Sequence, residues 1–381
     1  MSAERLQRVG AEIDRIVESG ELIGMTALIA RRGKLVFQHT TGVLDAETGA
    51  PLSHDSLLRI YSMTKPVTAV AAMILVEEGR LRLDEPVTRF FPEWAGQTAL
   101  ENDIAVPVAT PVTARHLLMH TSGLSYGYYG DTPVDRLYRK AQLIDDWDYL
   151  TYDTRELVEK LAAIPLLFHP GTRWHYGFSS DVLGHLVERV SGTSLDEFMQ
   201  TRLFEPLGMR DTHFNVPPDK LDRFGTDQYI EADGQVIVQD SPREDPEFID
   251  VTFLSGGGGL VTTAEDYQRF AMMLANGGKL GTARILSPAT VRLMTSDLLP
   301  AGLNIGSANG GFGLGFRVER NVRALKRTLS PGSYSWGGAA GTFFWVDPVE
   351  DIVAVFMPQR LNSPKWIQPT MQNLVYAAID E

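Results

Sequence analysis

The sequence predicts an α/β protein in which strands from both ends of the chain form one sheet, flanked by helices and carrying a mostly helical lobe. Short apolar runs of strand length occur near both termini, and most of the residues between them follow helical spacing. The chain has 381 residues, 44% of them hydrophobic, so it can bury a large core. Because this length exceeds one typical domain, we expect one large unit with a lobe or insertion.

The N-terminal part is expected to form a helix followed by a β-hairpin. Two apolar runs, 25–31 and 34–39, flank Arg32-Gly33, a pattern typical of a hairpin. Residues 1–5 precede no apolar core of the signal-peptide kind, so we interpret this end as a mature helix. The residues that give this helix its apolar face recur at helical spacing: Leu6, Val9, Ile13, Ile16 and Val17.

The C-terminal part is expected to supply the rest of the sheet. Strand-like runs occur at 313–318, 333–338, 342–346 and 352–357, with a turn at Asp347-Pro348. A last helix is predicted over 368–379. Strands at both ends, with helices between them, predict one antiparallel sheet built from both termini.

The middle of the chain, residues 84–168, is expected to form the helical lobe. Its helical patterns are broken by prolines, and it contains few strand-like runs. Residues 1–83 and 169–381 would then form a discontinuous α/β domain. We find no internal repeat and no low-complexity tract.

Composition excludes several kinds of function. The chain has 48 acidic and 35 basic residues and a formal net charge of −13, with no basic run, so we expect neither nucleic-acid nor membrane partners. The absence of cysteine excludes disulfides, thiolate catalysis and cysteine-zinc sites. No apolar stretch reaches the length of a membrane span. We therefore expect a cytoplasmic protein, although a longer precursor could have lost a signal sequence.

One short motif could carry chemistry. Ser62 and Lys65 lie three residues apart at the start of an apolar helical run, so their side chains would project from one helix face. A desolvated lysine loses its proton more easily and can activate a neighbouring hydroxyl. Free N–H groups at a helix N-terminus also favour developing negative charge. A serine and lysine at this spacing are common by chance, so an exposed surface pair is the alternative.

Two distant segments give this pair a context. Tyr176 lies just ahead of a predicted helix at 181–190, and Trp336-Gly337-Gly338 lies on a predicted strand. With the segments 120–124 and 255–260, these motifs follow in order along nearly the whole chain. In this combination the chain resembles the serine β-lactamase and penicillin-binding-protein superfamily, of which S-x-x-K is a signature. Within it, the chain looks most like the family VIII carboxylesterases, which resemble class C β-lactamases.

The resemblance implies a serine esterase with an acyl-enzyme intermediate and neither metal nor cofactor. Ser62 would attack the ester carbonyl, and Lys65 and Tyr176 would share the general-base work. Tyr176 would also protonate the leaving alcohol and later activate water, with the lysine ammonium stabilising phenolate character. The oxyanion hole would be the backbone N–H groups of Ser62 and Ala339.

Departures from the β-lactamase pattern favour esters over lactams. Trp336 stands where lactamases carry the cation of Lys-Thr-Gly, and Phe178 stands where their Tyr-x-Asn motif has asparagine. We expect both residues, with Gly337 and Gly338, to bind the substrate. Aromatic residues expected near the site suggest short-chain or aryl esters: Trp147, Tyr149, Trp336 and Phe344.

Tyr126, Tyr128 and Tyr129 are expected to form a wall of the pocket, with ordinary loop packing as the alternative. Ser125 lies in a G-x-S-x-G sequence, but that elbow needs a preceding strand, and here a helix-like segment precedes it. The eight histidines show no metal-binding spacing, and 255–259 lacks the Gly-Lys-Ser/Thr of a phosphate loop.

Three other functions stay open: a true β-lactamase or D-amino-acid peptidase, an acyltransferase of the same fold, and a non-enzymatic penicillin-binding sensor. The expected partner is a small-molecule ester, and the oligomeric state stays open.

Overall fold

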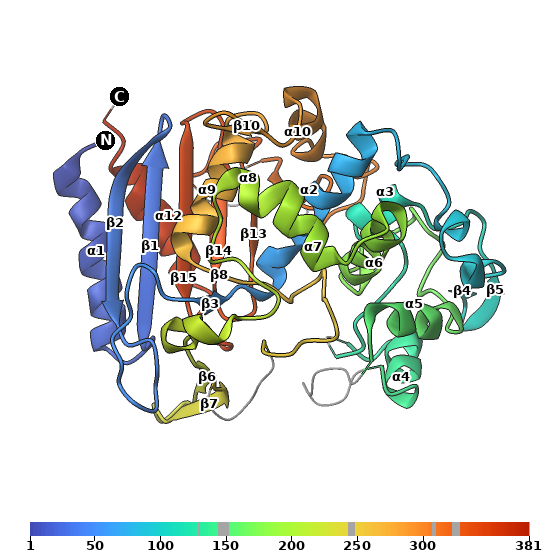
Figure 1. The fold of residues 1–381 in the computed structure, drawn as a ribbon, viewed down its shortest axis with the longest axis horizontal. Coiled ribbons are helices and arrows are strands. Elements are labelled where there is room, and N and C mark those ends of the chain that lie inside the picture. The colour runs from blue at the N-terminus through green and yellow to red at the C-terminus, as the bar shows by residue number, and fades with distance from the viewer. Residues whose placement is uncertain (129, 144–151, 243–247, 307–309, 322–327, 381) are drawn as a thin grey trace.

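The computed structural model of the chain describes residues 1–128, 130–143, 152–242, 248–306, 310–321 and 328–380. Its centre is a seven-stranded antiparallel sheet in the order β11-β12-β13-β14-β15-β1-β2. Strand β1 pairs with β15 from Met25↔Pro358 to Arg31↔Ile352, so the sheet joins the two ends of the chain (Figure 1). The predicted fold class is therefore confirmed. The strands are β1 (Gly24–Arg31), β2 (Lys34–Gly42), β11 (Gly310–Phe312), β12 (Arg317–Glu319), β13 (Tyr334–Gly337), β14 (Phe343–Asp347) and β15 (Ile352–Pro358).

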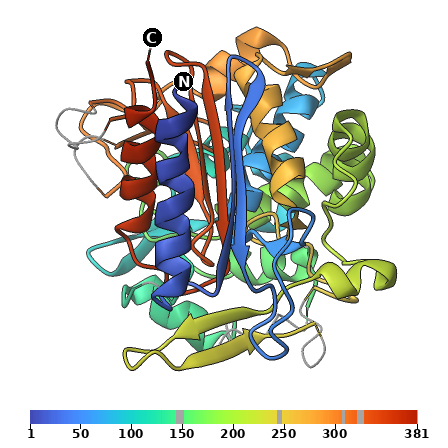
Figure 2. The ribbon, with the colours of Figure 1, turned by 90° about the vertical axis from the view of Figure 1, so that its left-hand side faces the viewer.

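Helices cover both faces of this sheet. Helices α1 (Ala3–Glu18) and α12 (Ile367–Ala377) pack on one face, and α9 (Ala264–Ala275) packs on the other (Figure 2). The alternation of side chains along β1 explains why: Ala27 and Ile29 belong to the core beside α1, whereas Leu28 and Ala30 belong to the larger core. Every residue of β1 is accordingly buried.

Helix α2 (Thr64–Glu77) lies in the middle of the larger core, and α6 (Ser179–Ser191) packs against it. Helix α6 also contacts α3 (Ala114–Leu118) and α5 (Thr154–Ala162) in the segment expected to form the lobe. This contact matters because the segments with the candidate site residues lie at the starts of α2 and α6.

The segment 84–168 contains α3, α4 (Pro133–Lys140) and α5, but it also contains a hairpin that the sequence reading missed. Strands β4 (Thr98–Glu101) and β5 (Ile104–Pro107) pair around Asn102 and Asp103, both with positive φ, as a two-residue hairpin turn requires. Most of its residues are exposed or half-buried, so no apolar alternation marks them. The proposed domain boundaries stay a prediction.

One predicted strand is wrong. The run 313–318 is not continuous, because the chain turns between β11 and β12. The N–H of Gly313 donates to the carbonyl of Phe316, and Gly315 has a φ of 91°, a left-handed conformation that favours glycine. A Cβ on Gly313 would also lie 2.0 Å from the carbonyl oxygen of Met294. The two glycines therefore reverse the chain at this point.

The remaining elements are short. They are β3 (Leu58–Arg59), β6 (Asp227–Ile230), β7 (Val236–Asp240), β8 (Val261–Thr262), β9 (Lys279–Leu280), β10 (Ala283–Arg284), α7 (Leu195–Met199), α8 (Glu205–Leu207) and α10 (Pro288–Met294), with 3₁₀ turns at Tyr61–Met63, Val87–Arg89, Pro92–Trp94 and Pro218–Arg223 and a π-helical turn at Gln200–Phe204.

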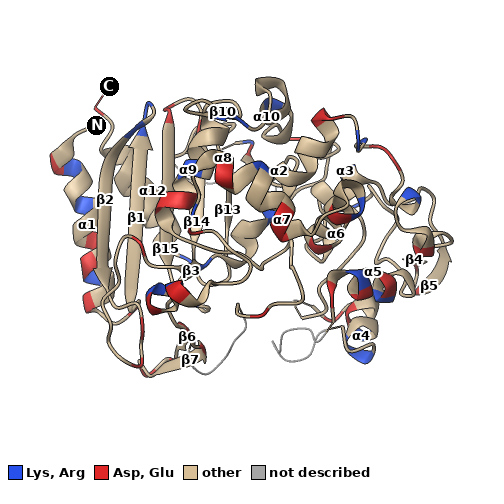
Figure 3. Ribbon diagram, in the orientation of Figure 1, with Lys and Arg blue, Asp and Glu red and all other residues tan. Residues whose placement is uncertain are grey.

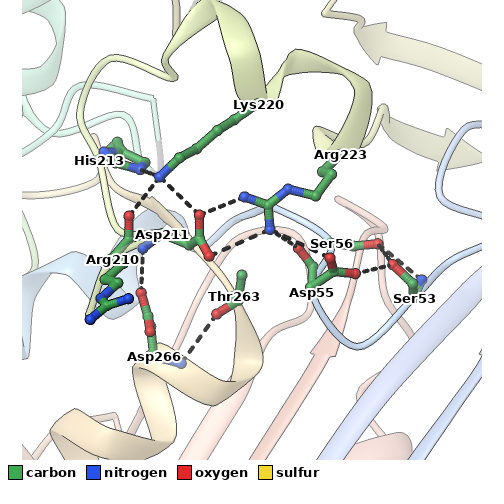
Figure 4. Close-up of polar contacts among 10 residues, drawn as sticks. All are labelled: Ser53, Asp55, Ser56, Arg210, Asp211, His213, Lys220, Arg223, Thr263 and Asp266. Atoms are coloured by element: carbon green, nitrogen blue, oxygen red, sulfur yellow. Dashed lines mark hydrogen bonds and ion pairs between the residues drawn. The ribbon is translucent and has the colours of Figure 1, made fainter. Parts of the chain in front are cut away.

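Strand β3 leads directly to Ser62. Ion pairs and hydrogen bonds of charged side chains hold the loop that precedes β3. Asp211 accepts from Lys220 at 2.9 Å and from Arg223 at 2.6 Å, and Arg223 also donates to the backbone carbonyl of Asp55 (Figure 4). Burial, followed by the charge of Lys220, lowers the pKa of His213 to about 4, so its neutral ring can accept a hydrogen bond from Lys220. These contacts link the loop before β3 to the segment 210–223.

Arg59, on β3 itself, is fully buried and pairs with Asp240. Elsewhere, charged residues gather mainly on helices and loops (Figure 3). Among the described residues, no helix has the length and apolar character that crossing a membrane requires.

Candidate active site

Ser62 sits in a single 3₁₀ turn that continues directly into α2. The residue before it, Tyr61, has a φ of 40°, an uncommon conformation for a bulky side chain. Neighbouring contacts hold the turn: the hydroxyl of Tyr267 donates to the carbonyl of Met63 at 2.9 Å, and Thr64 Oγ1 accepts the N–H of Leu260 at 3.1 Å. The strained backbone at Tyr61, next to Ser62, is thus held by contacts from several segments.

Lys65 lies one turn along, as the spacing predicted. Its Nζ is 3.1 Å from Oγ of Ser62 and 2.6 Å from the carbonyl oxygen of Gly257. The lysine is 3% exposed, in an almost entirely apolar helix. Burial lowers the pKa of Lys65 to about 7, although the charge of Asp181 acts in the opposite direction. A neutral amine is therefore available beside the hydroxyl near neutral pH.

Tyr176 reaches the same hydroxyl from the other side. Its Oη lies 2.6 Å from Oγ of Ser62. The ring is surrounded by other aromatic rings, with centroids at 5.1 Å for His120, 5.3 Å for Tyr126 and 5.7 Å for Trp336. Burial raises the pKa of Tyr176 above its ordinary value, so the resting phenol keeps its proton. The phenolate character expected from the sequence is therefore not the resting state, because the aromatic surroundings disfavour the charged form.

Asp181, in the first turn of α6, is a functional candidate that the sequence reading missed. Its carboxylate accepts hydrogen bonds from the hydroxyl of Ser255 at 2.5 Å and from the N–H of Gly257 at 3.0 Å. The carbonyl of the same Gly257 receives the hydrogen bond from Lys65. The sequence shows only an acidic residue at the start of a predicted helix, and it is the structure that buries this side chain to 2% exposure.

Glycine is needed at positions 256 and 257, because the backbone there passes close to Ser180 and Asp181 at the start of α6. A Cβ on Gly256 would lie 2.4 Å from the carbonyl oxygen of Ser180, and one on Gly257 would lie 2.5 Å from Oδ2 of Asp181. The segment 255–260, one of the ordered motifs of the sequence, therefore lies against Lys65 and Asp181.

A cavity of about 340 Å³ opens beside Ser62, within the size range of small-molecule sites. Ser62 and the strand motif 336–339 both line this cavity. Arg317 and Gln368 also border it, and neither was singled out in the sequence. The described lining residues are Ser62, Tyr176, Arg317, Ser335, Trp336, Gly337, Gly338, Ala339 and Gln368.

Three residues expected to bind substrate are not in that lining. Phe178 is buried and packs against Tyr126 and Tyr138, with ring centroids at 4.8 and 6.1 Å. Tyr126 and Tyr128 stack on each other at 5.1 Å. Together they form a layer behind Tyr176, so their contact with substrate stays a prediction.

The remaining aromatic residues that were expected near the site are Phe344, Tyr129, Trp147 and Tyr149. Phe344, expected near the site, pairs in register with Trp336 across β13 and β14, but its side chain is fully buried against Tyr267 and is not in the described lining of the cavity. Tyr129, Trp147 and Tyr149 lie outside the described residues.

Ser125, the alternative serine, belongs to a separate buried cluster. It is 3% exposed, donates to the carboxylate of Asp135 and contacts Nε2 of His175 at 2.9 Å. The segment before it contains α3 and a loop, not a strand, so the nucleophile-elbow geometry is absent there. Within the described ranges, no group of three or more His, Asp or Glu residues is placed to hold a metal ion.

A serine hydroxyl contacted by a buried lysine and a phenol, beside an antiparallel sheet built from both termini, defines the class of β-lactamase-fold serine hydrolases that act through an acyl-enzyme. The family model described as Beta-lactamase matches residues 9–376, so the chain belongs to the β-lactamase family.

Individual relatives show the breadth of that family. Esterase EstB of Burkholderia gladioli is 32% identical over 361 residues, covering 91% of this chain and 88% of the relative. Acyltransferase calJ of Penicillium decumbens is 28% identical over 359 residues, covering 86% and 82%. Among solved structures, EstCE1, described as a hydrolase with promiscuous acyltransferase activity, superposes with a TM-score of 0.86 at 27% identity and covers 98% of both chains.

Proposed function

We propose that the chain hydrolyses carboxylic esters with short acyl chains or aryl groups through an acyl-Ser62 intermediate. One observation carries the proposal: Oγ of Ser62 lies within hydrogen-bond distance of both Nζ of Lys65 and Oη of Tyr176, at the border of a cavity. Nucleophile and base within this reach are what covalent acyl transfer requires.

In the first half-reaction, neutral Lys65 accepts the proton of Ser62 while one of its N–H groups stays bound to the carbonyl of Gly257. Oγ then attacks the ester carbonyl and forms a tetrahedral intermediate. The N–H groups of Ser62 and Ala339 would stabilise its oxyanion; such donors are typically worth about 3–4 kcal/mol.

Tyr176 then donates its proton to the leaving alcohol oxygen as the carbon–oxygen bond breaks. Lys65, now an ammonium whose Nζ lies 4.6 Å from the centroid of the Tyr176 ring, then returns a proton to the phenolate, which restores the neutral amine and the phenol. In the second half-reaction, water attacks the acyl group, its proton passes to the same pair, and Ser62 is released with the carboxylic acid. The sum is ester and water giving acid and alcohol.

The lining of the cavity supports esters over lactams. Trp336 occupies the place of the lactamase cation, and its ring lies 5.7 Å from the ring of Tyr176, so an apolar surface adjoins the reacting groups. The modest volume supports a short acyl or aryl group.

Acyl transfer to an alcohol is the second candidate, favoured by the acyltransferase relative and the dual description of EstCE1. It uses the same acyl-Ser62 and differs only in the acceptor. Product analysis with and without an added alcohol separates the two reactions.

The decisive test is mass spectrometry of protein labelled with a fluorophosphonate. We expect the label on the peptide containing Ser62 and none after Ser62→Ala, with Ser125→Ala labelled as efficiently as the wild type. A label on Ser125 would overturn the proposal, and nitrocefin turnover matching that of p-nitrophenyl acetate would favour the lactamase alternative. Burst acylation without steady-state turnover would indicate a sensor.

A further inference from the structure

Lys65 becomes an ammonium when it accepts the proton of Ser62, and its surroundings then hold a positive charge away from water. The residue is 3% exposed, and burial disfavours the charged form of an amine. An ammonium has three N–H donors, and two acceptors lie beside Nζ, Oγ of Ser62 at 3.1 Å and the carbonyl of Gly257 at 2.6 Å. Among the described residues, no third oxygen accepts from this nitrogen. The third N–H group is therefore stabilised in another way.

Two tyrosine rings lie beside this nitrogen. Nζ of Lys65 is 4.6 Å from the ring centroid of Tyr176 and 5.3 Å from that of Tyr126. Both distances are within the roughly 6 Å at which the negative face of an aromatic ring attracts a cation. The attraction is stronger where water is excluded, and Tyr126 is only 6% exposed. Both rings are thus placed to stabilise the ammonium.

The ring of Tyr126 is held in this place by other aromatic rings. Its centroid lies 4.8 Å from that of Phe178 and 5.3 Å from that of Tyr176, both edge-to-face. It also stacks on Tyr128 at 5.1 Å. Such packing fixes the distance between the ring and Lys65, so the lysine meets the same aromatic surface in each catalytic cycle.

We propose that the ring of Tyr126 stabilises the ammonium form of Lys65 by a cation–π interaction, and so keeps this buried amine basic enough to accept the proton of Ser62. Tyr126 is absent from the described lining of the cavity beside Ser62, so its effect on turnover passes through the lysine. It is therefore a positioning residue and not a catalytic one. The proposal rests on the proposed function, which makes Lys65 the base.

Asp181, His120 and Tyr176 are the other titratable groups that face Lys65 in the described part of the chain. Burial, followed by the charge of Lys65, lowers the pKa of His120 well below its ordinary value, so its ring stays neutral. Burial raises the pKa of Tyr176, so the resting phenol keeps its proton. Burial also raises the pKa of Asp181, although the charge of Lys65 acts in the opposite direction. Asp181 is the same in every variant at position 126, so its titration cannot produce a graded shift among them.

Fluorinating one ring at nearly constant shape tests the interaction. The series is Tyr126→Phe followed by the 4-fluoro, 3,5-difluoro and 3,4,5-trifluoro forms of that phenylalanine, in which the negative ring face weakens stepwise. A weaker attraction lowers the pKa of Lys65, so the acidic limb of kcat/KM for p-nitrophenyl acetate should move to lower pH with each fluorine. The total shift should be about one pH unit. This limb reports the free enzyme, so a changed substrate contact alone does not move it.

Two ordinary variants bracket the series. Tyr126→Phe keeps the ring and should leave the limb close to that of the wild type. Tyr126→Leu removes the ring and should move the limb at least as far as the trifluoro form does. Circular dichroism checks that each variant is folded, and the fluorinated forms, which differ little in shape, keep the test independent of the tolerance for leucine.

Phe204 provides the matched control. It is fully buried in the same core, and no cation lies over its ring among the described residues. The same fluorinated series there should leave the limb in place. A limb that stays fixed along the series at position 126, or that moves equally in the Phe204 series, would overturn the inference while leaving the esterase proposal intact. A wild type that cleaves no ester, or that lacks the acidic limb, would instead refute the proposed function with Lys65 as its base.

Discussion

The phenol oxygen of Tyr176 lies 2.6 Å from the hydroxyl oxygen of Ser62, although the two residues are 114 positions apart. Ser62 precedes α2 and Tyr176 precedes α6, and these two helices pack against each other. The contact between the starts of two helices therefore sets the geometry of the candidate reacting groups.

Tyr176→Phe removes the hydroxyl and keeps the ring. We expect kcat/KM to fall about 10²–10⁴-fold, because the change removes a general acid that protonates the leaving group. Circular dichroism should stay native, since the ring keeps its aromatic contacts. An ester with a very acidic leaving group should lose less activity, and an equal loss for all leaving groups would contradict the acid role.

The pH dependence of kcat/KM should show an acidic limb near pH 7. Burial lowers the pKa of Lys65 to about 7, so the neutral amine that accepts the serine proton increases as pH rises through this value. Below it, the rate should fall about ten-fold per pH unit. Steady-state rates from pH 5 to 9 measure the limb.

The same limb should persist in His175→Gln, because burial already lowers the pKa of His175 below the ordinary range. Its disappearance in that variant would assign the titration to the histidine and not to Lys65.

Asp181→Asn should move the limb. The negative charge of Asp181 raises the pKa of Lys65, so removing that charge should lower it and shift the acidic limb to lower pH. The amide oxygen can still accept from Ser255 and Gly257, so the loop geometry is kept. Loss of activity at all pH values, without a shift, would mean that Asp181 acts only on structure.

Gly256→Ala should destabilise the protein by about 1–3 kcal/mol, because overpacking a fitted site costs that much. The new Cβ would lie 2.4 Å from the carbonyl oxygen of Ser180. Gly258→Ala is the matched control, since the nearest atom to its Cβ lies at 3.8 Å. Urea unfolding of both variants makes the comparison, and equal losses would show that the tight approach at Gly256 has no special role.

Features encoded by neighbouring residues could be predicted from the sequence. The hairpin at Arg32-Gly33 was confirmed, because two apolar runs and the turn signal between them lie within one short stretch. Ser62 and Lys65 were expected on one helix face, and their 3.1 Å contact follows from the helical repeat. Local patterns also failed where a turn interrupted them, as in the predicted strand 313–318.

The position of Tyr176 against Ser62 was expected only through a family resemblance, since no local pattern fixes a contact across 114 positions. Asp181 and Arg317 were missed for the same reason. A buried carboxylate or a guanidinium facing a cavity is defined by which distant segments surround it, and burial, not residue type, changes its acidity and hydrogen bonding.

The sequence by itself therefore determined the strands at both ends, the helix carrying Ser62 and Lys65, and the ordered motifs of the family. Only the tertiary structure decided that the pKa of Lys65 falls to about 7, that Phe178 packs against Tyr126 and that Arg317 borders the cavity. Secondary structure follows from interactions between near neighbours, whereas desolvation and cavity shape arise only when distant segments pack together.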